Sequence, residues 1–418
     1  MLPSPSPQLD VYWADECVGT LHDGSLLAFE YAPTWLQRTP PLPLADMPLQ
    51  LGRNDTAAVQ SFFENLLPEG ELRQHLMEQK KASTLFALLR EVAGDTVGGF
   101  TLLPAGQAPE APRYEATSWP ELASRLGRPA STAIDLQGQH TRISLAGAQD
   151  KTSIALFADG IPRLPLGTSP STHILKPNIR RLTKVWHSAA NETLVMRTAA
   201  HCGLPTAEVF YEPLTQSCVV RRFDRTLRPD GSLGRIIQYD LCQLAHTMSE
   251  KKYEKEGGPS IASCATLIRQ HSSQPAVDLR LLVSWIMFNL YTGNNDSHAK
   301  NLSLYRPPGQ GPQLTPFYDL MCTRLYPGLS PEFAFAIGGE TQPGRITASH
   351  IATMAAELGI RPRFVSQIAA DLAHKIPAAL TQAVAEVSPT LPHSAQVLAE
   401  RLQQFILSTT RKTAARLM

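Results

Sequence analysis

The sequence is poor in several features that would identify particular classes of protein. Its six cysteines lie far apart and form no C-x-x-C pair, which argues against a zinc ribbon and against a disulfide framework. Aromatic residues make up only 7% of the chain. Neither sign of charge dominates, because 38 Lys and Arg face 37 Asp and Glu. A polybasic nucleic-acid coat and an acidic tail are therefore excluded, and any charged site must be local.

Long apolar runs are also missing. The most apolar stretch, 277–291, is interrupted by Asp278, Arg280, Ser284 and Asn289, and it is too short to span a membrane. The first ten residues, MLPSPSPQLD, contain no basic segment followed by an apolar one, so they do not resemble a secretion signal. We expect a soluble cytoplasmic protein that does not enter a membrane.

The 418 residues, 43% of them hydrophobic, suffice for roughly two to three domains. Near the start, β-type residues predict strands at 9–13, 17–21 and 26–31. Two stretches with apolar residues at helical spacing come next. We expect Asp55 and Ser83 to stand at the N-terminal ends of these two helices. The Pro- and Ala-rich stretch 104–112 is typical of a linker.

A second β-rich block follows the linker and gives way to helices. Strands are expected at 142–145, 152–157, 173–176, 208–211 and 218–223, and a helix at 191–202. From about residue 240 the pattern is helical, and the nearly all-apolar stretch 278–290 predicts a buried helix. We expect an α+β protein with a β-rich N-terminal lobe, an extra N-terminal subdomain, a helical C-terminal lobe and a cleft between the lobes. The predicted domains are 1–110, 111–246 and 247–418.

The most informative polar segment is GNNDSHAKN at 293–301, directly after the predicted buried helix. Asp296 and Asn301 are five residues apart, and Asp319 follows 18 residues after Asn301 in TPFYD. Phosphoryl transfer in kinase-like folds uses these groups in this order: an Asp for the attacking hydroxyl, then an Asn and a second Asp for Mg²⁺. D-x₄-N alone is common in solvated loops, so the prediction rests on the combination of these residues with the preceding buried helix.

A kinase-like site also needs an upstream lysine for the phosphates and an acidic partner on a neighbouring helix. Lys176 ends the predicted strand in THILKP, and Glu192 lies in the helix after it. By position alone Lys176 would be an ordinary surface lysine at a strand end. Its order before Glu192, Asp296 and Asp319 favours the functional interpretation.

A phosphate-covering loop should precede the lysine. The stretch 144–152, SLAGAQDKT, lies between two predicted strands, and its small residues would let backbone N–H groups approach an anion. A plain hairpin turn is the alternative, because the stretch matches no established phosphate-loop motif. RRFDR at 221–225 would lie beside the adenine, with Gln243 just beyond. His298, beside Asp296, resembles a general base, but the favoured interpretation is that it hydrogen-bonds backbone and holds its loop. Lys300 could contact the γ-phosphate or the substrate, or have a structural role only.

The motifs ISLAGAQDKTS, THILKP, RRFDR, LCQ, KYEKEGGPSIA, NNDSHAKN and LTPFYDL, in this order, resemble the HipA family of serine/threonine-kinase toxins. YAPTWL, FFENLLPEG and DTVGGFTLLP extend the resemblance from about residue 9 to the C-terminus, as in a full-length member. The resemblance implies a two-lobed protein-kinase-like fold and an ATP- and Mg²⁺-dependent enzyme. It implies a catalytic Asp296, the metal ligands Asn301 and Asp319, and an autophosphorylated, self-inactivating Ser144. The implied nucleotide-binding residues are Ala146, Gly147, Ala148, Gln149, Lys151, Lys176, Arg222, Phe223, Asp224, Gln243, His298 and Lys300.

The resemblance also implies partners. Members of the family pair with a small helix-turn-helix antitoxin dimer that binds DNA, and relatives modify aminoacyl-tRNA synthetases. A near-neutral chain fits a kinase brought to DNA mainly by its antitoxin. Two other interpretations stay open at this point: a small-molecule phosphotransferase, and a catalytically silent co-repressor acting through the antitoxin.

Overall fold

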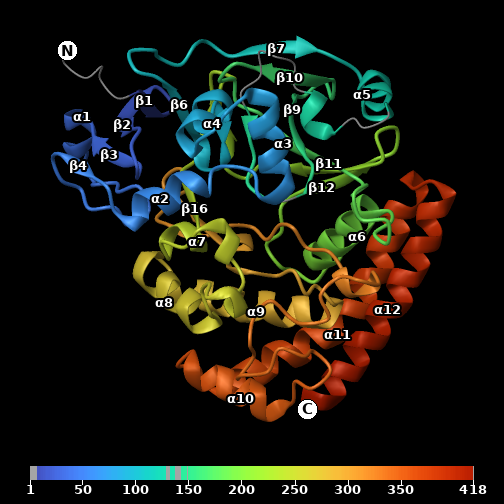
Figure 1. Cartoon of the computed structure of the whole chain (residues 1–418). Coiled ribbons are helices and arrows are strands. Elements are labelled where there is room, and N and C mark those ends of the chain that lie inside the picture. The colour runs from blue at the N-terminus through green and yellow to red at the C-terminus, as the bar shows by residue number, and fades with distance from the viewer. Residues whose placement is uncertain (1–6, 129–131, 137–142, 148, 418) are drawn as a thin grey trace. The chain divides into compact units, whose positions relative to one another are not determined.

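The computed structural model describes residues 7–128, 132–136, 143–147 and 149–417, and its chain divides into two compact units (Figure 1). The first unit comprises Met1–Ile174, Arg222–Lys251 and Tyr305–Gly309. The second comprises Leu175–Arg221, Lys252–Leu304 and Gln310–Met418. Because the chain passes several times between the units, each is described by itself. The domain boundaries expected at 110 and 246 stay a prediction.

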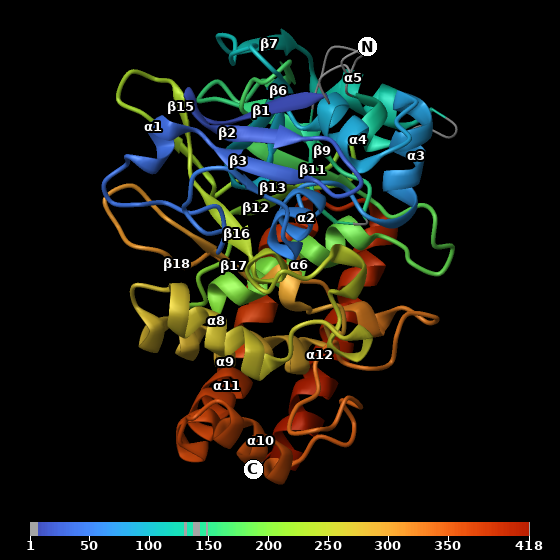
Figure 2. The ribbon, with the colours of Figure 1, turned by 60° about the vertical axis from the view of Figure 1, so that its left-hand side comes forward.

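The first unit begins with a five-stranded antiparallel sheet in the order β4-β3-β2-β1-β6. β1, β2 and β3 lie side by side in Figure 2. They correspond to the three strands expected at 9–13, 17–21 and 26–31, which are therefore confirmed. Alternate residues such as Leu9 and Val11 are fully buried, as expected for a sheet with one face on a core. The strands are β1 (Gln8–Trp13), β2 (Glu16–His22), β3 (Ala28–Tyr31), β4 (Arg53–Asn54) and β6 (Phe100–Pro104).

Four helices accompany this sheet: α1 (Pro33–Leu36), α2 (Ala57–Glu64), α3 (Gly70–Lys80) and α4 (Leu85–Val92). The expected caps were each wrong by one residue. Thr56 precedes α2, and Thr84 precedes α4, where its side chain accepts a hydrogen bond from Ala87 N at 3.1 Å. No periodic signal predicts α3, because only Leu72 and Leu76 of its eleven residues are buried and most of the rest are polar.

The rest of the first unit is built from short strands. β10 (Pro162–Leu166) pairs antiparallel with β7 (Arg113–Ala116) and β9 (Thr152–Leu156), and β5 (Asp95–Thr96) pairs in parallel with β8 (Ile143–Ser144). β11 (His173–Pro177) starts in the first unit and ends in the second. The remaining elements are α5 (Trp119–Leu126), β14 (Arg225–Leu227), β15 (Leu233–Arg235), β16 (Gln238–Asp240) and α7 (Leu241–Leu244).

A cluster of buried charges lies within the first unit. Asp95 is fully buried, and its carboxylate accepts from Arg222 Nη1 at 3.1 Å and Arg225 Nη2 at 2.6 Å. Asp224 pairs with the same two guanidinium groups at 2.8 and 2.9 Å. Burial alone would raise the pKa of Asp95, but the arginines Arg225, Arg222 and Arg235 outweigh it and hold that pKa well below its usual range.

The second unit is mainly helical. Its long helix α11 (Pro362–Val387) packs against α6 (Ser188–His201), α9 (Pro275–Thr292) and α12 (His393–Leu417). The helix expected at 278–290 is confirmed as α9 and is buried along nearly its whole length. α11 and α12 are long helices of 26 and 25 residues, in the region where the sequence predicts a helical pattern. Other elements are the antiparallel pair β12 (Val209–Glu212) and β13 (Ser217–Arg221), α8 (Ile261–His271), β17 (Ser303–Tyr305), β18 (Gln313–Leu314) and α10 (Ala348–Glu357).

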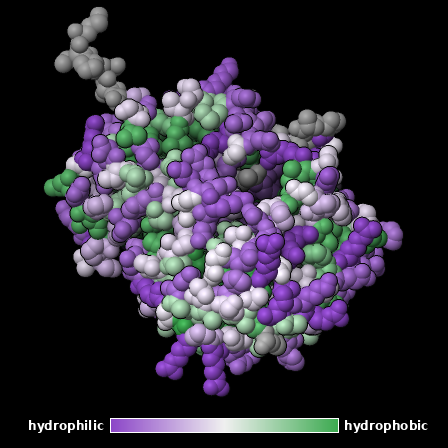
Figure 3. All heavy atoms as spheres, turned by 60° about the horizontal axis from the view of Figure 1, so that its bottom comes forward, coloured by the Kyte–Doolittle hydropathy of each residue, from purple (hydrophilic) through white to green (hydrophobic). Residues whose placement is uncertain are grey.

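The surface shows apolar side chains interspersed among hydrophilic ones on the face drawn in Figure 3. Among the described residues, no helix has the length and apolar character needed to cross a membrane.

The buried charge cluster predicts a large stability effect. Asp95→Asn leaves two buried guanidinium groups without their shared counter-charge, so the free energy of unfolding should fall by about 3–5 kcal/mol. Because the pKa of Asp95 is lowered on folding, this advantage of the parent should shrink as the pH falls below about 4. Denaturant titration at pH 7 and at acid pH would measure both effects.

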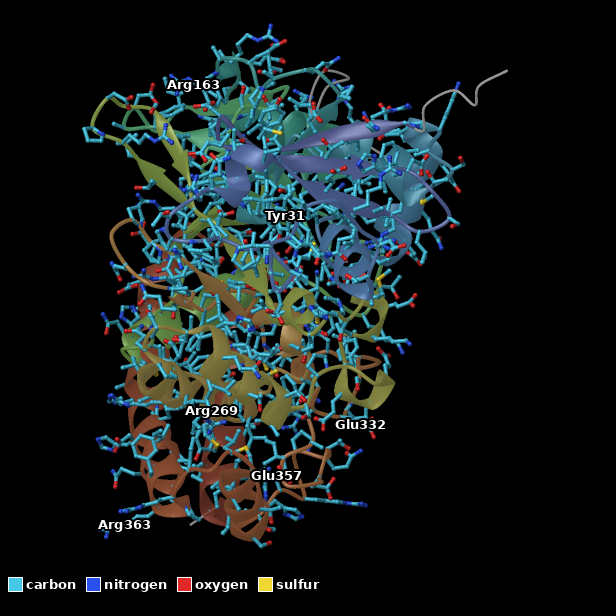
Figure 4. All side chains as sticks on the ribbon, turned by 90° about the vertical axis from the view of Figure 1, so that its left-hand side faces the viewer. Tyr31, Arg163, Arg269, Glu332, Glu357 and Arg363 are labelled. Atoms are coloured by element: carbon cyan, nitrogen blue, oxygen red, sulfur yellow. The ribbon has the colours of Figure 1, made fainter. Side chains whose placement is uncertain are left out.

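Asp159→Asn serves as the matched control. Asp159 forms an exposed ion pair with Arg163 in the same unit (Figure 4), and such surface pairs contribute little. Equal destabilisation by the two substitutions would contradict the importance of the buried cluster.

Candidate active site

A polar site in the second unit is built around Lys176, whose side chain is buried. Its ammonium group donates to Glu192 Oε1 at 2.6 Å and to Asp319 Oδ1 at 2.7 Å. Its side chain is 7% exposed and that of Glu192 only 1%, whereas that of Asp319 is 37% exposed. Burial lowers the pKa of Lys176, but the carboxylates of Asp319 and Glu192 more than reverse this, so the net shift is upward. The lysine is therefore a fixed positive charge.

Helix α6 holds this cluster in place. Glu192 reaches Lys176 from the first turns of α6, and the preceding residue, Asn191, exchanges two hydrogen bonds with the backbone of Cys322, at 2.9 and 3.1 Å. The same helix therefore orients the lysine and anchors the chain just after Asp319. Asp319 itself has a left-handed backbone with a φ of 57°, which is uncommon for a residue other than glycine and typical of constrained sites.

The loop after α9 is held by hydrogen bonds to its own side chains and to the segment after Asp319. α9 ends at Gly293, whose φ of 77° is suited to glycine. Asn294 Oδ1 accepts from Asp296 N at 3.1 Å, and Thr323 Oγ1 accepts from Asn295 N at 2.8 Å. These bonds fix the backbone that leads into Asp296, whose side chain is exposed.

Asp296 has an aromatic neighbour that sequence reasoning missed. Tyr253 Oη donates a hydrogen bond to Asp296 Oδ1. The Tyr253 ring packs edge-on against His298, with ring centroids 5.0 Å apart, and His298 Nε2 lies 3.9 Å from the same carboxylate oxygen. Tyr253 lies in KYEKEGGPSIA, one of the motifs that carry the family resemblance, but the sequence analysis assigned it no role.

Asn301 and Lys300 lie on the 3₁₀ turn Ala299–Asn301. Asn301 Nδ2 donates to the backbone carbonyl of Asp296 at 3.0 Å, so the two predicted residues are in contact. Tyr318, next to Asp319, donates to the backbone carbonyl of Lys300 at 3.0 Å. The second unit therefore brings together Lys176, Glu192, Asp296, His298, Lys300, Asn301 and Asp319.

The oxygen donors of this site fit a hard divalent cation. Asp319 offers a carboxylate and Asn301 an amide oxygen, which are the ligand types that Mg²⁺ prefers. No group of three His, Cys, Asp or Glu suited to a metal occurs in the part of the chain that the structure describes. Mg²⁺ bound through one or two side-chain oxygens usually takes its other ligands from phosphate groups and water.

The predicted phosphate loop lies in the first unit. Ser144 is fully buried, and its Oγ donates to the backbone carbonyl of Leu66 at 2.6 Å. Lys151 Nζ donates to the carbonyl of Ala146 at 2.7 Å, and Gly147 has a φ of 106°. A Cβ at Gly147 would come within 2.6 Å of Lys151 Nζ. Gln149 is half-buried, while Ala148 lies outside the described residues.

A second feature that the sequence analysis missed holds this loop. The segment 62–69, from FFENLLPEG, binds Ser144 through the carbonyl of Leu66, and Glu69 N donates to the carbonyl of Gly147 at 3.2 Å. The same segment also binds the stretch 243–249: Asn65 Nδ2 donates to the Thr247 carbonyl at 2.9 Å, and the Glu64 carboxylate accepts from Ser249 N at 2.8 Å.

The predicted adenine-side residues are also in the first unit. Arg222 and Asp224 are buried in the Asp95 cluster, so their side chains are committed to one another and to Asp95. The Phe223 ring packs edge-on against Tyr305, with centroids 5.9 Å apart. Gln243 forms a capping box with Asp240 at the start of α7, and its Nε2 donates to the Phe62 carbonyl at 3.1 Å.

Comparison with known proteins places these features in one family. Residues 9–103 match the model of the HipA N-terminal domain, and residues 143–380 match that of the HipA-like C-terminal domain. The serine/threonine-protein kinase toxin HipA of Shewanella oneidensis is 30% identical, over 92% of this chain and 90% of its own length. The Sinorhizobium fredii protein Y4mE is 36% identical, over 93% and 94%.

The fold agrees with this assignment. A solved HipA structure, in the complex of Shewanella oneidensis HipA with HipB and operator DNA, superposes with a TM-score of 0.82 over 96% of both chains at 26% identity. The expected α+β kinase-like fold is therefore confirmed. A kinase of this kind uses ATP and a divalent metal. The chain belongs to the HipA family of serine/threonine-kinase toxins.

Proposed function

We propose that this protein transfers the γ-phosphoryl group of Mg-ATP to a serine or threonine of a cellular protein and thereby arrests translation and growth. The observation that carries the proposal is the contact of Lys176 with both Glu192 and Asp319, in the same unit as the bonded pair Asp296 and Asn301. These are the charges that phosphoryl transfer requires.

Each residue has a defined part in the proposed reaction. Mg-ATP, when bound, supplies the phosphoryl group and the cation that neutralises it. Lys176, kept charged by its two carboxylates, would contact the phosphates, while Asn301 and Asp319 would hold the metal. Asp296, exposed at the end of its loop, would orient the acceptor hydroxyl and take its proton. Most of the rate gain would come from positioning and charge neutralisation.

A protein substrate is favoured over a small molecule by the HipA N-terminal domain at residues 9–103, which a small-molecule phosphotransferase would not require. A silent co-repressor is disfavoured, since Lys176, Asp296, Asn301 and Asp319 are all present. Relatives that modify aminoacyl-tRNA synthetases suggest a substrate of that class.

The proposed partners follow from the Shewanella complex, which contains HipA, HipB and operator DNA. We assign to this protein a helix-turn-helix antitoxin dimer as partner. DNA would be reached mainly through that antitoxin, because the net charge of +1 gives the chain little affinity of its own for phosphate backbones. Cytoplasmic location is part of the same proposal.

Regulation is assigned to Ser144. In its buried position the hydroxyl donates to Leu66, and a phosphate ester has no proton to donate there. Phosphorylated Ser144 would also bring about −1.5 to −2 charges into a fully buried site. The modified loop must therefore leave this position, which would remove its backbone N–H groups from the nucleotide.

The first test concerns Asp296. Asp296→Asn should lower phosphotransfer to lysate proteins by about 10²–10⁴-fold while Mg-ATP binding, measured by calorimetry, persists. Growth arrest on expression should disappear with the activity. Asp371→Asn, which changes an exposed carboxylate on α11, is the matched control. A variant at Asp296 as toxic as the parent would refute the kinase explanation of toxicity.

The metal ligands allow a separate test. Asp319→Ala and Asn301→Ala should each weaken Mg-ATP binding or turnover and raise the Mg²⁺ concentration needed for half-maximal activity, because each removes an oxygen ligand. Calorimetry and Mg²⁺ titration measure this. Unchanged affinity and turnover in both variants would exclude these residues as ligands.

The Ser144 switch predicts opposite behaviour of two variants. Ser144→Asp should lose Mg-ATP affinity sharply, because it places a charge in the buried loop, whereas Ser144→Ala should keep nucleotide binding. Incubation of the parent with Mg-ATP should yield phosphoserine at position 144 as activity declines. Stoichiometric phosphate on Ser144 in fully active protein would reject the switch.

A further inference from the structure

Tyr253 is hydrogen-bonded to the carboxylate of Asp296, which the hydroxyl of the acceptor must reach in the proposed reaction. Its phenolic O–H donates to Asp296 Oδ1, which is the kind of contact that an attacking hydroxyl makes with the catalytic aspartate of a kinase. A hydrogen bond to a charged group is stronger than one between neutral groups. The Asp296 side chain is 53% exposed, so water has access to the carboxylate, and Tyr253 competes with it.

The position of Tyr253 is fixed from several sides. Its ring rests edge-on against buried His298, and its backbone carbonyl accepts from Glu256 N and Gly258 N, both at 3.0 Å. The turn that it begins ends at Gly257, with a φ of 87°. The hydroxyl is thus presented to Asp296 by an ordered turn.

That turn is anchored to a second loop of the same unit. The carboxylate of Glu254 accepts from Ala336 N at 2.8 Å, and burial raises its pKa. Lys255 pairs with Glu332, labelled in Figure 4, at 3.5 Å. The backbone of Tyr253 therefore cannot move away from Asp296 without disturbing contacts between the segments 253–258 and 332–336.

From this geometry we infer that Tyr253 is a specificity-determining residue: its hydroxyl holds Asp296 until a protein acceptor displaces it, and so suppresses hydrolysis of ATP by water. The inference rests on the proposed kinase function. A protein acceptor can use binding energy from contacts remote from the reacting hydroxyl to displace Tyr253, whereas water has no such contacts.

The side reaction that Tyr253 would suppress is the hydrolysis of ATP by water. A water oxygen forms a bond to the γ-phosphorus, the bond from that phosphorus to the β–γ bridging oxygen breaks, and ADP leaves with the electron pair. The proton of the water passes to Asp296, the same role that this residue has toward an acceptor hydroxyl. With Tyr253 bonded to Oδ1, water is oriented less often.

Tyr253→Phe tests the inference, because it removes the hydroxyl and keeps the ring that packs on His298. Phosphate release from Mg-ATP without any protein acceptor should rise about tenfold, as expected for the loss of one hydrogen bond to a charged group. Tyr211→Phe is the matched control and should leave release unchanged. Tyr211 is a buried tyrosine of the same unit, and its hydroxyl has no hydrogen-bond partner among the described residues.

The double variant Tyr253→Phe/Asp296→Asn distinguishes loss of the hydrogen bond to Asp296 from a general disturbance of the site. The extra hydrolysis should vanish in it, falling to the level of Asp296→Asn alone. If Tyr253→Phe hydrolyses ATP no faster than a parent that labels lysate proteins, or if the extra hydrolysis survives in the double variant, the inference is wrong. A parent that neither binds Mg-ATP nor labels any protein would instead overturn the proposed function, and the inference with it.

Discussion

A buried ammonium group needs counter-charges within bonding distance, and this requirement fixes the arrangement of the candidate site. Lys176 meets Glu192, 16 residues along the chain, and Asp319, 143 residues along. Leaving either partner out would strand a buried charge at a cost of several kcal/mol. The lysine therefore reaches its observed position only when α6 and the segment after β18 are both in place. The charges needed for phosphoryl transfer are thus coupled to completion of the fold in the second unit.

In the first unit, ion pairs between buried residues likewise hold Arg222 and Asp224 of the predicted adenine-side connector. Arg222 and Asp224 come from RRFDR, and Asp95 comes from DTVGGF, 127 residues away from Arg222. Since these three side chains are buried together, their contribution to nucleotide binding would be to fix the backbone of the connector. Buried charges that are paired with one another specify a conformation more than they stabilise it, because desolvation offsets most of their attraction.

The sequence was sufficient for much of this picture, for physical reasons. The runs of β-type residues in β1 to β3 and the nearly all-apolar pattern of α9 are local signals, so those elements were predicted correctly. The pairing of Lys176 with Glu192 was also predicted, because motif order in a kinase-like fold implies it. The polar helix α3 was missed, since burying only Leu72 and Leu76 leaves no clear period. Asp95 and Tyr253 were missed because their partners, Arg222 and Asp296, are distant in sequence and no local pattern connects them.

Segment 62–69 connects the N-terminal part of the chain to the predicted phosphate loop. This segment belongs to the part that matches the HipA N-terminal domain, yet it bonds Ser144 and Gly147 of the predicted phosphate loop and Thr247 and Ser249 beyond α7. Small residues give the loop little packing of its own, so a backbone carbonyl from outside, that of Leu66, supplies the acceptor that a buried serine hydroxyl requires. Any change at Ser144 that removes its proton therefore acts on the N-terminal domain as directly as on the loop itself.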